Sequence, residues 1–321
     1  MELISLSLNI QESDELIMPS YNFVGVANSF ANLGARLVFA DIDPHTMNID
    51  SDSIARAVTD KTRAVVVMHY GGVSCNMTKI VEICQDKNLV LIEDNAQGFL
   101  CSLEDRYLGS FGDFSVISFG KMKNISCGEG GVLLYKEERH EQIIDVFYNG
   151  TNRSDFERGI VKKYEWTGKG SKFDLGEFAA AVLFPLLENG VSICAERRCK
   201  WDYLYKLLLQ QEETSSLVPR GLDIFKHQGH VFYIKCKDEK HREYLINGLA
   251  ERGIASAFHF SPIHASPYAQ AKGYVVENDY NTILESNKIL RLPIYNAITF
   301  KNLDYISEVL FKLCVDERKL A

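Results

Sequence analysis

The sequence predicts an α/β fold in which a mostly parallel sheet has helices on both faces and is followed by a smaller C-terminal α+β domain. Two patterns support this prediction. Up to Tyr135, short apolar runs alternate with amphipathic segments, and repeated strand–helix–strand units build a parallel sheet that is covered on both sides. From Glu177 onwards the pattern becomes helical and then mixes strands with helices. We therefore expect a large domain over residues 1–190, and a long helix with a small domain over residues 191–321.

The elements of the first half follow from periodicity and from capping residues. Apolar runs predict strands at Glu15–Met18, Arg36–Ala40, Arg63–His69, Leu89–Glu93, Asp113–Phe119 and Gly131–Tyr135. Between the first four runs, amphipathic segments predict helices at Val24–Leu33, Ser51–Thr59 and Asn76–Lys87. Asn76 is the expected N-cap of the third helix, because an asparagine side chain accepts hydrogen bonds from the free backbone N–H groups of a first helical turn.

The second half begins with a long helical pattern. From Glu177 to about Gln211 the chain is rich in Ala and Leu, and Pro185 is the expected break or kink. Residues 212–216 have the composition of a surface loop. Beyond them the pattern predicts a strand (Val231–Cys236), a helix (Glu239–Arg252), a strand (Ile254–Phe260) and a last helix (Leu303–Cys314).

Composition narrows the function classes. The 321 residues carry a net charge of −8, which argues against binding to nucleic acid or to an anionic membrane surface. The eight cysteines are scattered without a C-x-x-C pair, a pattern typical of reduced cytoplasmic thiols and not of a zinc site. The sequence contains no apolar stretch near the ~20 residues of a membrane span. We expect a cytoplasmic protein without a structural metal.

Two chemically informative signals follow predicted strands. The run Leu89–Ile92 leads into Glu93 and Asp94, and Lys123 lies in a glycine-flanked turn after Ser118. A lysine amine can form a Schiff base with an aldehyde, and a carboxylate can hold the pyridine nitrogen of pyridoxal phosphate protonated, so that the ring withdraws electrons. The Ser118 hydroxyl can donate to the cofactor phosphate. Ligands of such sheets collect at the carboxyl ends of the strands, where all of these groups are expected to lie.

Nucleotide-binding alternatives explain these residues less well. An acidic residue after a buried strand also occurs in nucleotide hydrolases, which additionally need the G-x-x-x-x-G-K-[ST] loop. The nearest candidate, Gly168-Lys169-Gly170-Ser171, lacks the earlier glycine, and residues 128–131 lack the G-x-G-x-x-G spacing. Most lysines are solvated surface groups, so Lys123 alone is weak evidence of catalysis. Its order and spacing relative to Asp94 carry the hypothesis.

Several motifs together resemble the DegT/DnrJ/EryC1/StrS family of sugar aminotransferases. The similarity runs from residue 1 to the C-terminus. Its specific pieces are residues 18–23 (MPSYNF), 41–44 (DIDP), 93–97 (EDNAQ), 128–131 (GEGG), 258–264 (FHFSPIH) and 291–293 (RLP). The resemblance implies a fold-type-I transferase that depends on pyridoxal phosphate. Residues 150–154 and 163–166 are most similar to the branch that makes dTDP-4-amino-4,6-dideoxygalactose for enterobacterial common antigen.

The resemblance assigns cofactor roles by position. Lys123 corresponds to the Schiff-base lysine that later moves the proton between the substrate carbon and the cofactor. Asp94 corresponds to the aspartate at the pyridine nitrogen, Gln97 to a residue near the ring hydroxyl and Ser118 to the phosphate-binding serine. Phe23 corresponds to the aromatic residue that stacks on the cofactor ring, although an aromatic residue at such a position is more often part of a core.

Other roles implied by the resemblance concern the substrate and the partner subunit. His264 and Arg291 lie in motifs near the sugar-nucleotide site, where a structural histidine is equally compatible with the pattern. Family members are homodimers, and Lys172 stands where many place an asparagine that reaches the partner's phosphate. Lys121 competes with Lys123, because spacing alone does not choose between them. We prefer Lys123 because in the family Lys-Asn precedes the turn.

The implied reaction moves an amino group from L-glutamate to the 4-keto carbon of a dTDP-4-keto-6-deoxyhexose. A related 3-dehydratase has histidine in place of the lysine, so Lys123 argues against that reaction. There are two alternatives. The chain is a transaminase for another nucleotide-linked keto sugar, or it is an inactive relic of the family. The family usually begins some tens of residues before Met1, with a turn that binds the cofactor phosphate at a helix N-terminus. We therefore expect that the chain lacks part of the phosphate site.

Overall fold

A seven-stranded sheet forms the centre of the protein in the computed structural model, which describes residues 1–222 and 224–320. The neighbouring strands are parallel except for the last pair, which is antiparallel. Their order across the sheet is β10 (Val275–Val276), β2 (Arg36–Ala40), β1 (Glu15–Pro19), β3 (Thr62–Met68), β4 (Val90–Asp94), β7 (Phe114–Ser118) and β8 (Gly131–Tyr135). The predicted α/β sheet is confirmed.

Helices cover both faces of this sheet because successive strand residues point to opposite sides. Val66 and Ile92 share one core with Phe30, while Val65 and Leu91 share another with Ile80. The first core is covered by α1 (Glu2–Ser7), α2 (Val24–Ala31) and α5 (His140–Phe147), and the second by α3 (Ser51–Ala57) and α4 (Met77–Asp86).

The capping signals in the sequence correspond to caps in the structure. The Asn76 side chain accepts a hydrogen bond from the backbone N–H of Lys79 at 3.4 Å, as expected of the N-cap of α4. Asp50 caps α3 by accepting from the N–H groups of Asp52 and Ser53. Both helices therefore begin where an oxygen is available to satisfy the first free N–H groups.

The long helical stretch is two helices and not one. α7 (Glu177–Glu188) and α8 (Gly190–Leu209) meet at Asn189 and are bent by 69°. Pro185 lies inside α7, four residues before the bend, so the predicted break at Pro185 is displaced. The Asn189 amide donates to the carbonyl of Pro185 at 2.8 Å, so the end of α7 is satisfied by a side chain at the bend itself.

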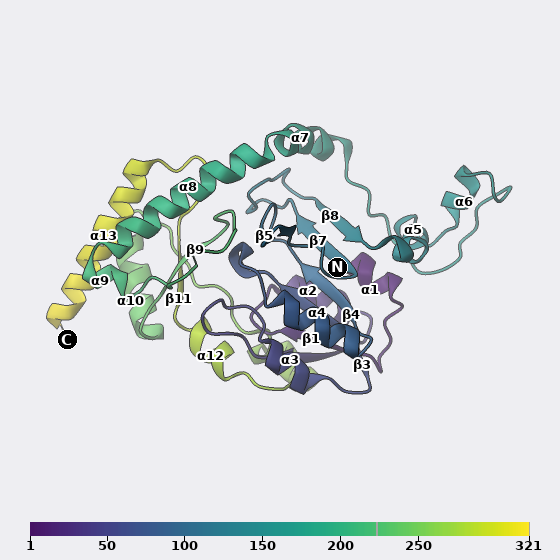
Figure 1. Ribbon diagram of the computed structural model, residues 1–321, viewed down its shortest axis with the longest axis horizontal. Coiled ribbons are helices and arrows are strands. Elements are labelled where there is room, and N and C mark those ends of the chain that lie inside the picture. The colour runs from purple at the N-terminus through teal and green to yellow at the C-terminus, as the bar shows by residue number, and fades with distance from the viewer. Residues whose placement is uncertain (223, 321) are drawn as a thin grey trace.

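α8 leads to a second core in the C-terminal part. Figure 1 shows it running from α7, next to the large sheet, to the helices α10 (Glu239–Ala250) and α13 (Phe300–Leu320). These helices pack with the antiparallel pair β9 (Phe232–Lys235) and β11 (Ile289–Leu292), and this core contains Trp201, Leu245, Leu290 and Leu310. Residues 275–276 return from this part to the edge of the large sheet as β10.

Three differences from the sequence prediction concern the C-terminal part. The predicted strand 254–260 has only one bridge, between Ala257 and Arg291. Its next contacts are with the segment that follows β1, where the His259 carbonyl accepts from the Tyr21 hydroxyl, and Ile263 N–H donates to Ser20 O at 3.0 Å. The expected loop at 212–216 contains the short helix α9 (Glu212–Ser215). Between residues 263 and 286 the chain also forms η3 (Ile263–Ala265), α11 (Pro267–Lys272) and α12 (Tyr280–Ser286).

The remaining elements are short and belong to connections. A two-stranded unit, β5 (Ser102–Leu103) and β6 (Arg106–Tyr107), precedes β7. Single 3₁₀ turns occur at η1 (Tyr70–Gly72) and η2 (Glu137–Arg139), and α6 (Arg153–Glu157) lies in a segment that extends away from the body (Figure 1). Within the described residues, no single helix is long and apolar enough to cross a membrane, and only the bent pair α7–α8 reaches that length and composition together.

Candidate active site

The carboxyl ends of the central strands meet beside one cavity. Asp94 is the last residue of β4, Ser118 is the last residue of β7, and Lys123 follows in the turn after β7. A cavity of about 660 Å³ opens between this turn and the C-terminal part. Its polar lining consists mainly of Lys121, Lys123, Asn124, Arg197, His230 and Arg291. The place agrees with the rule that open α/β sheets bind ligands at their strand ends.

Burial changes the charges of Asp94 and Lys123. Burial raises the pKa of the Asp94 carboxyl. The backbone N–H of Ala96 and the positive charges of Lys123 and the Met1 ammonium lower it, but by less than burial raises it. Burial lowers the pKa of the Lys123 ammonium, and the attraction of Asp94 opposes this effect. Among the described residues, no protein group is hydrogen-bonded to the Lys123 amine. An amine whose pKa is lowered by burial loses its proton more easily and attacks a carbonyl more readily.

Lys121 differs from Lys123 in burial and not in position along the cavity. Both residues line the cavity, but Lys121 is exposed whereas Lys123 is half-buried and is coupled electrostatically to Asp94. This difference in burial favours Lys123 as the Schiff-base lysine, whereas the spacing in the sequence does not distinguish the two lysines. The assignment of the lysine stays a prediction until it is labelled directly.

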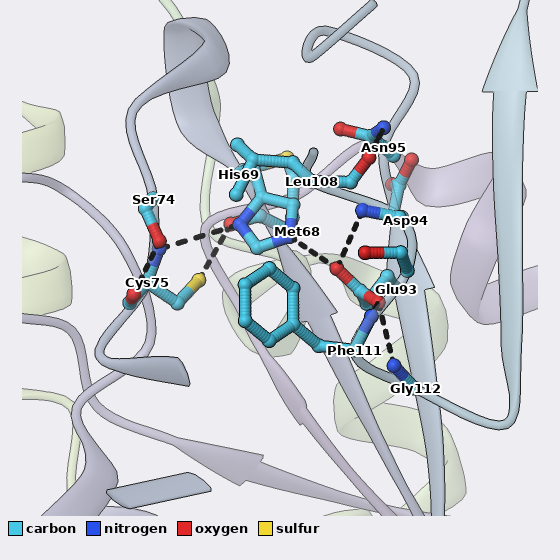
Figure 2. Close-up of polar contacts among 12 residues, drawn as sticks. Met68, His69, Ser74, Cys75, Glu93, Asp94, Asn95, Leu108, Phe111 and Gly112 are labelled. Carbon is cyan, nitrogen blue, oxygen red and sulfur yellow. Dashed lines mark hydrogen bonds and ion pairs between the residues drawn. The ribbon is translucent and has the colours of Figure 1, made fainter. Parts of the chain in front are cut away.

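A fully buried network stands directly behind Asp94, as Figure 2 shows. His69 follows β3, and its Nε2 lies 2.9 Å from Oε2 of Glu93, the residue before Asp94. The Nδ1 atom of His69 accepts from the backbone N–H of Cys75 at 3.3 Å, which makes Nε2 the protonated nitrogen that donates to Glu93. Since alternate residues face opposite sides of a strand, Glu93 is available for this contact while Asp94 faces the site.

The same glutamate holds the turn that precedes β7. Glu93 Oε1 accepts from the N–H groups of Phe111 at 2.7 Å and Gly112 at 2.6 Å, and Oε2 accepts from Gly109 at 2.8 Å. Burial alone would raise the pKa of the Glu93 carboxyl, but His69 and these N–H groups outweigh it and lower the pKa. Glu93 therefore ties β3, β4 and the start of β7 together, which places Asp94 and Ser118 relative to each other.

Three further groups fit the remaining parts of pyridoxal phosphate. Gln97 Oε1 accepts from the N–H of Gly71 at 2.8 Å, so its NH₂ group is left as a donor for the ring oxygen. Ser118 Oγ accepts from the N–H of Gly120 at 3.3 Å, so its O–H can donate to a phosphate. The Phe23 side chain is 60% exposed after the buried strand β1, which leaves a ring free to stack. Together with Asp94 and Lys123, these residues fit the cofactor.

Comparison with known proteins decides the family. Residues 1–311 match the model of the DegT/DnrJ/EryC1/StrS aminotransferase family. The chain belongs to this family. The comparisons do not support the expectation of a missing segment before Met1.

Relatives and solved structures agree with the family. The chain is 31% identical over 308 residues to the spore coat polysaccharide biosynthesis protein SpsC of Bacillus subtilis, which covers 93% of this chain and 79% of the relative. It is 31% identical over 270 residues to the dTDP-4-dehydro-2,3,6-trideoxy-D-glucose 4-aminotransferase of Saccharopolyspora spinosa, which covers 82% of this chain and 70% of the relative. The crystal structure of the aminotransferase TlmJ from Streptoalloteichus hindustanus superposes with a TM-score of 0.88 at 26% identity, over 99% of this chain and 84% of that chain.

Family membership establishes the fold and the cofactor. The chain is a fold-type-I, pyridoxal phosphate-dependent sugar aminotransferase. The predicted fold class, enzyme class and cofactor are confirmed. The individual site residues stay predictions, since the comparisons concern the chain as a whole.

Of the predicted site residues, the lining of the cavity contains Lys123 and Arg291 but not Phe23, Asp94, Gln97, Ser118, Lys172 or His264. Lys172 is in the extended segment of this DegT-family chain, where its side chain is 74% exposed and lies 4.0 Å from Asp174. Both ring nitrogens of His264 are engaged, because Nδ1 lies 2.7 Å from Ser20 Oγ and Nε2 lies 3.1 Å from Asp279. Within one chain, neither side chain joins Lys123 and Asp94, whereas Arg291 lines the same cavity as Lys123.

Other residues at the site were not found from the sequence. The Tyr70 hydroxyl lies 3.0 Å from Nδ1 of His259 and 3.2 Å from the hydroxyl of Tyr21, so three segments meet in one buried cluster. Tyr70 follows β3 at a carboxyl strand end, a position that could have been inspected from the pattern. Arg197 donates to the carbonyls of Gly229, His230 and Ile294 at 2.9–3.0 Å, a role that only the packed structure reveals.

Proposed function

We propose that this enzyme moves an amino group from L-glutamate to the 4-keto carbon of a dTDP-4-keto-6-deoxyhexose, with dTDP-4-amino-4,6-dideoxygalactose as the product. The observation that carries the proposal is the half-buried Lys123, coupled to the buried Asp94, at a cavity that also contains Arg291. Pyridoxal phosphate supplies the electron-withdrawing ring that carries the amino group from one substrate to the other. Lys123 moves the proton at the substrate carbon, and Asp94 holds the proton at the ring nitrogen.

Of the two arginines that line the cavity, Arg291 has a buried donor without a partner among the described residues. The guanidinium of Arg197 donates hydrogen bonds to three backbone carbonyls, whereas Arg291 Nε is buried without a hydrogen-bond partner among the described residues. A planar guanidinium binds carboxylates and phosphates by paired hydrogen bonds. We assign Arg291 to the carboxylate of the amino donor or to the diphosphate of the sugar nucleotide. His264, whose ring nitrogens are both engaged, is proposed to hold the edge of the substrate site in place.

A dTDP-linked 4-keto sugar as acceptor rests on two lines of support. One relative is named as a 4-aminotransferase of a dTDP-4-dehydro sugar. In addition, residues 150–154 and 163–166 are similar to the galactose-forming branch. The second candidate is a transaminase for another nucleotide-linked keto sugar of surface polysaccharides, which the similarity to a spore coat polysaccharide protein favours. We place the activity in the cytoplasm, because all eight cysteines are free thiols.

The proposed enzyme is a homodimer. On α7 the side chain of Phe178 is 93% exposed, and Phe184 and Leu187 are also exposed. The segment that carries α6 extends away from the body (Figure 1) and contains Trp166, which is 83% exposed. Exposed apolar side chains that gather in a patch mark interfaces. A second copy would cover them, and Lys172 on the same segment would reach the partner's cofactor phosphate.

The experiment that tests the function is a substrate panel. The purified protein is loaded with pyridoxal phosphate and mixed with L-glutamate and each of several dTDP- and UDP-linked 4-keto sugars, and the amino sugar is identified by mass spectrometry and NMR. The proposal expects turnover with the dTDP-4-keto-6-deoxyhexose and an axial 4-amino group in the product. Turnover only with another nucleotide sugar would favour the second candidate, and a protein that binds no cofactor would be an inactive relic.

A further inference from the structure

One histidine of the cavity has its tautomer fixed by its neighbours. His230 Nδ1 lies 2.8 Å from Oδ1 of Asn124, the residue after Lys123. The Asn124 Nδ2 group donates to the carbonyl of Gln228 at 2.9 Å, so the amide oxygen is the atom that faces the histidine. An amide oxygen only accepts hydrogen bonds. His230 Nδ1 must therefore carry the proton, and Nε2 has the free lone pair.

The charges around His230 keep its ring neutral. The residue is 9% exposed, and burial lowers the pKa of its imidazole well below the usual value, with the charges of Lys123, Arg197, His259 and Arg291 acting in the same direction. These four groups are all cationic or potentially cationic. Protonation of His230 would therefore add a positive charge beside groups that already oppose it.

The free nitrogen is an acceptor at a cavity that has many donors. His230 lines the cavity together with Lys123 and Arg291, and no described residue is hydrogen-bonded to its Nε2. Both proposed substrates bring an amine to this cavity, the amino acid as it enters and the amino sugar as it leaves. An amine or ammonium group is a donor, and the guanidinium of Arg291 does not accept from it.

We propose that His230 is a positioning residue that accepts, through Nε2, a hydrogen bond from the amine that is being transferred. The inference rests on the proposed function in one respect, the use of an amine donor with a carboxylate. His230 takes no proton in this role, and it orients the nitrogen beside Lys123 in both half-reactions. Asn124 acts through His230 by holding its tautomer.

The first test compares two ligands that differ in the amine alone. L-Glutamate and glutarate have the same two carboxylates, and glutarate lacks the amine. In the holoenzyme, His230→Phe is expected to weaken glutamate binding about tenfold to a hundredfold, the range of a charge-assisted hydrogen bond, and to change glutarate binding less than about threefold. Glutamate binding is measured from the absorbance change of the bound cofactor and glutarate binding by competition. Equal weakening of both ligands would overturn the proposal.

His227→Phe is the matched control. His227 is a buried histidine of the same loop, its ring lies 4.5 Å from that of Trp201, and it lines a different cavity. If loss of a buried imidazole merely loosens the loop, His227→Phe will produce the same selective loss of glutamate binding, and the proposal is wrong. The expected result is reduced thermal stability with an unchanged ratio of glutamate to glutarate affinity.

Asn124→Asp tests the tautomer. A carboxylate beside Nδ1 would raise the pKa of the His230 imidazole, and a protonated ring has no acceptor. Glutamate binding by this variant should therefore be weak near neutral pH and recover as pH rises. In the wild-type protein, the ratio of glutamate to glutarate affinity should not change with pH over the same range. In parallel, ¹⁵N NMR of the cofactor-free protein should show Nδ1 protonated and Nε2 unprotonated near neutral pH. A protonated Nε2 overturns the inference without touching the proposed function, whereas a wild-type holoenzyme that responds to no amine donor refutes the function itself.

Discussion

At the scale of single residues, burial separates two lysines that the sequence places two positions apart. Lys123 is half-buried and coupled to Asp94, and Lys121 is exposed. Lys123→Ala is expected to abolish the visible absorbance of the bound cofactor and all amino transfer, and Lys121→Ala to retain both at least in part. Borohydride reduction of the holoenzyme followed by peptide mapping checks the assignment. A label on Lys121 would show that the wrong lysine was chosen.

The role proposed for Asp94 depends on the negative charge that its burial disfavours. Asp94→Asn removes the counter-charge of the ring nitrogen, so we expect retained cofactor binding with most of the turnover lost. The loss should exceed about tenfold, or about 1.4 kcal/mol of barrier. Steady-state kinetics and cofactor titration measure the two effects separately. A smaller loss would mean that another group keeps the ring nitrogen protonated.

The same carboxylate has an opposite effect on stability in the absence of the cofactor. Its pKa in the folded state is raised, so the protonated form stabilises the fold, and this contribution is lost as pH rises through the folded pKa. Asp94→Asn should therefore raise the melting temperature of the cofactor-free protein more at about pH 8 than at about pH 5. Thermal melts of both proteins at these two pH values test the sign, and a less stable variant at the higher pH would contradict it.

At the scale of elements, the His69–Glu93 network connects three strands behind the site. The Glu93 carboxylate accepts from His69 and from three backbone N–H groups. Loss of hydrogen bonding to a buried charged group costs about 1–3 kcal/mol, so Glu93→Gln should lower the free energy of unfolding by about this amount in urea titrations. Because the pKa of Glu93 is lowered in the folded state, its contribution to stability is lost as pH falls through that folded-state pKa. Glu165→Gln is the control, because the Lys163–Glu165 pair is exposed and its loss should stay within about 0.5 kcal/mol. Equal effects would show that the network is dispensable.

At the scale of the whole molecule, the apolar side chains of α7 predict a second subunit. Phe178→Glu puts a charge where the proposed interface requires an apolar surface, and we expect a shift from dimer to monomer with loss of activity. Sedimentation velocity at several concentrations measures the shift. Tyr305→Glu, at an exposed position of α13, is the control and should leave the dimer intact. A wild-type protein that is monomeric at all concentrations would contradict the proposal.

Local sequence signals predicted the elements whose formation depends only on neighbouring residues in the chain. Residues 36–40 and 131–135 were predicted with the bounds that the structure has, because an apolar run between polar turns leaves few alternatives for a strand. Asn76 was predicted as a cap for the same local reason. Asp94 and Lys123 could be proposed as site residues because the expected chemistry depends on residue type and on their order after strands.

The sequence by itself determined the α/β order of elements, and it predicted Asp94 and Lys123 as the pair of groups that a pyridoxal phosphate enzyme requires. Tertiary structure alone decided where the helical stretch after Glu177 bends, at Asn189, whose amide donates to Pro185. It also decided that residues 254–260 form no strand, because His259 contacts Tyr21 after the end of β1, a partner that periodicity does not assign. It also decided the tautomer of His230. Asn124, whose amide oxygen faces His230 Nδ1, is 106 residues away in the sequence, and its own orientation is fixed by the carbonyl of Gln228. Periodicity reports which face of an element is apolar, whereas the protonation and direction of a buried polar group depend on neighbours that only packing brings together.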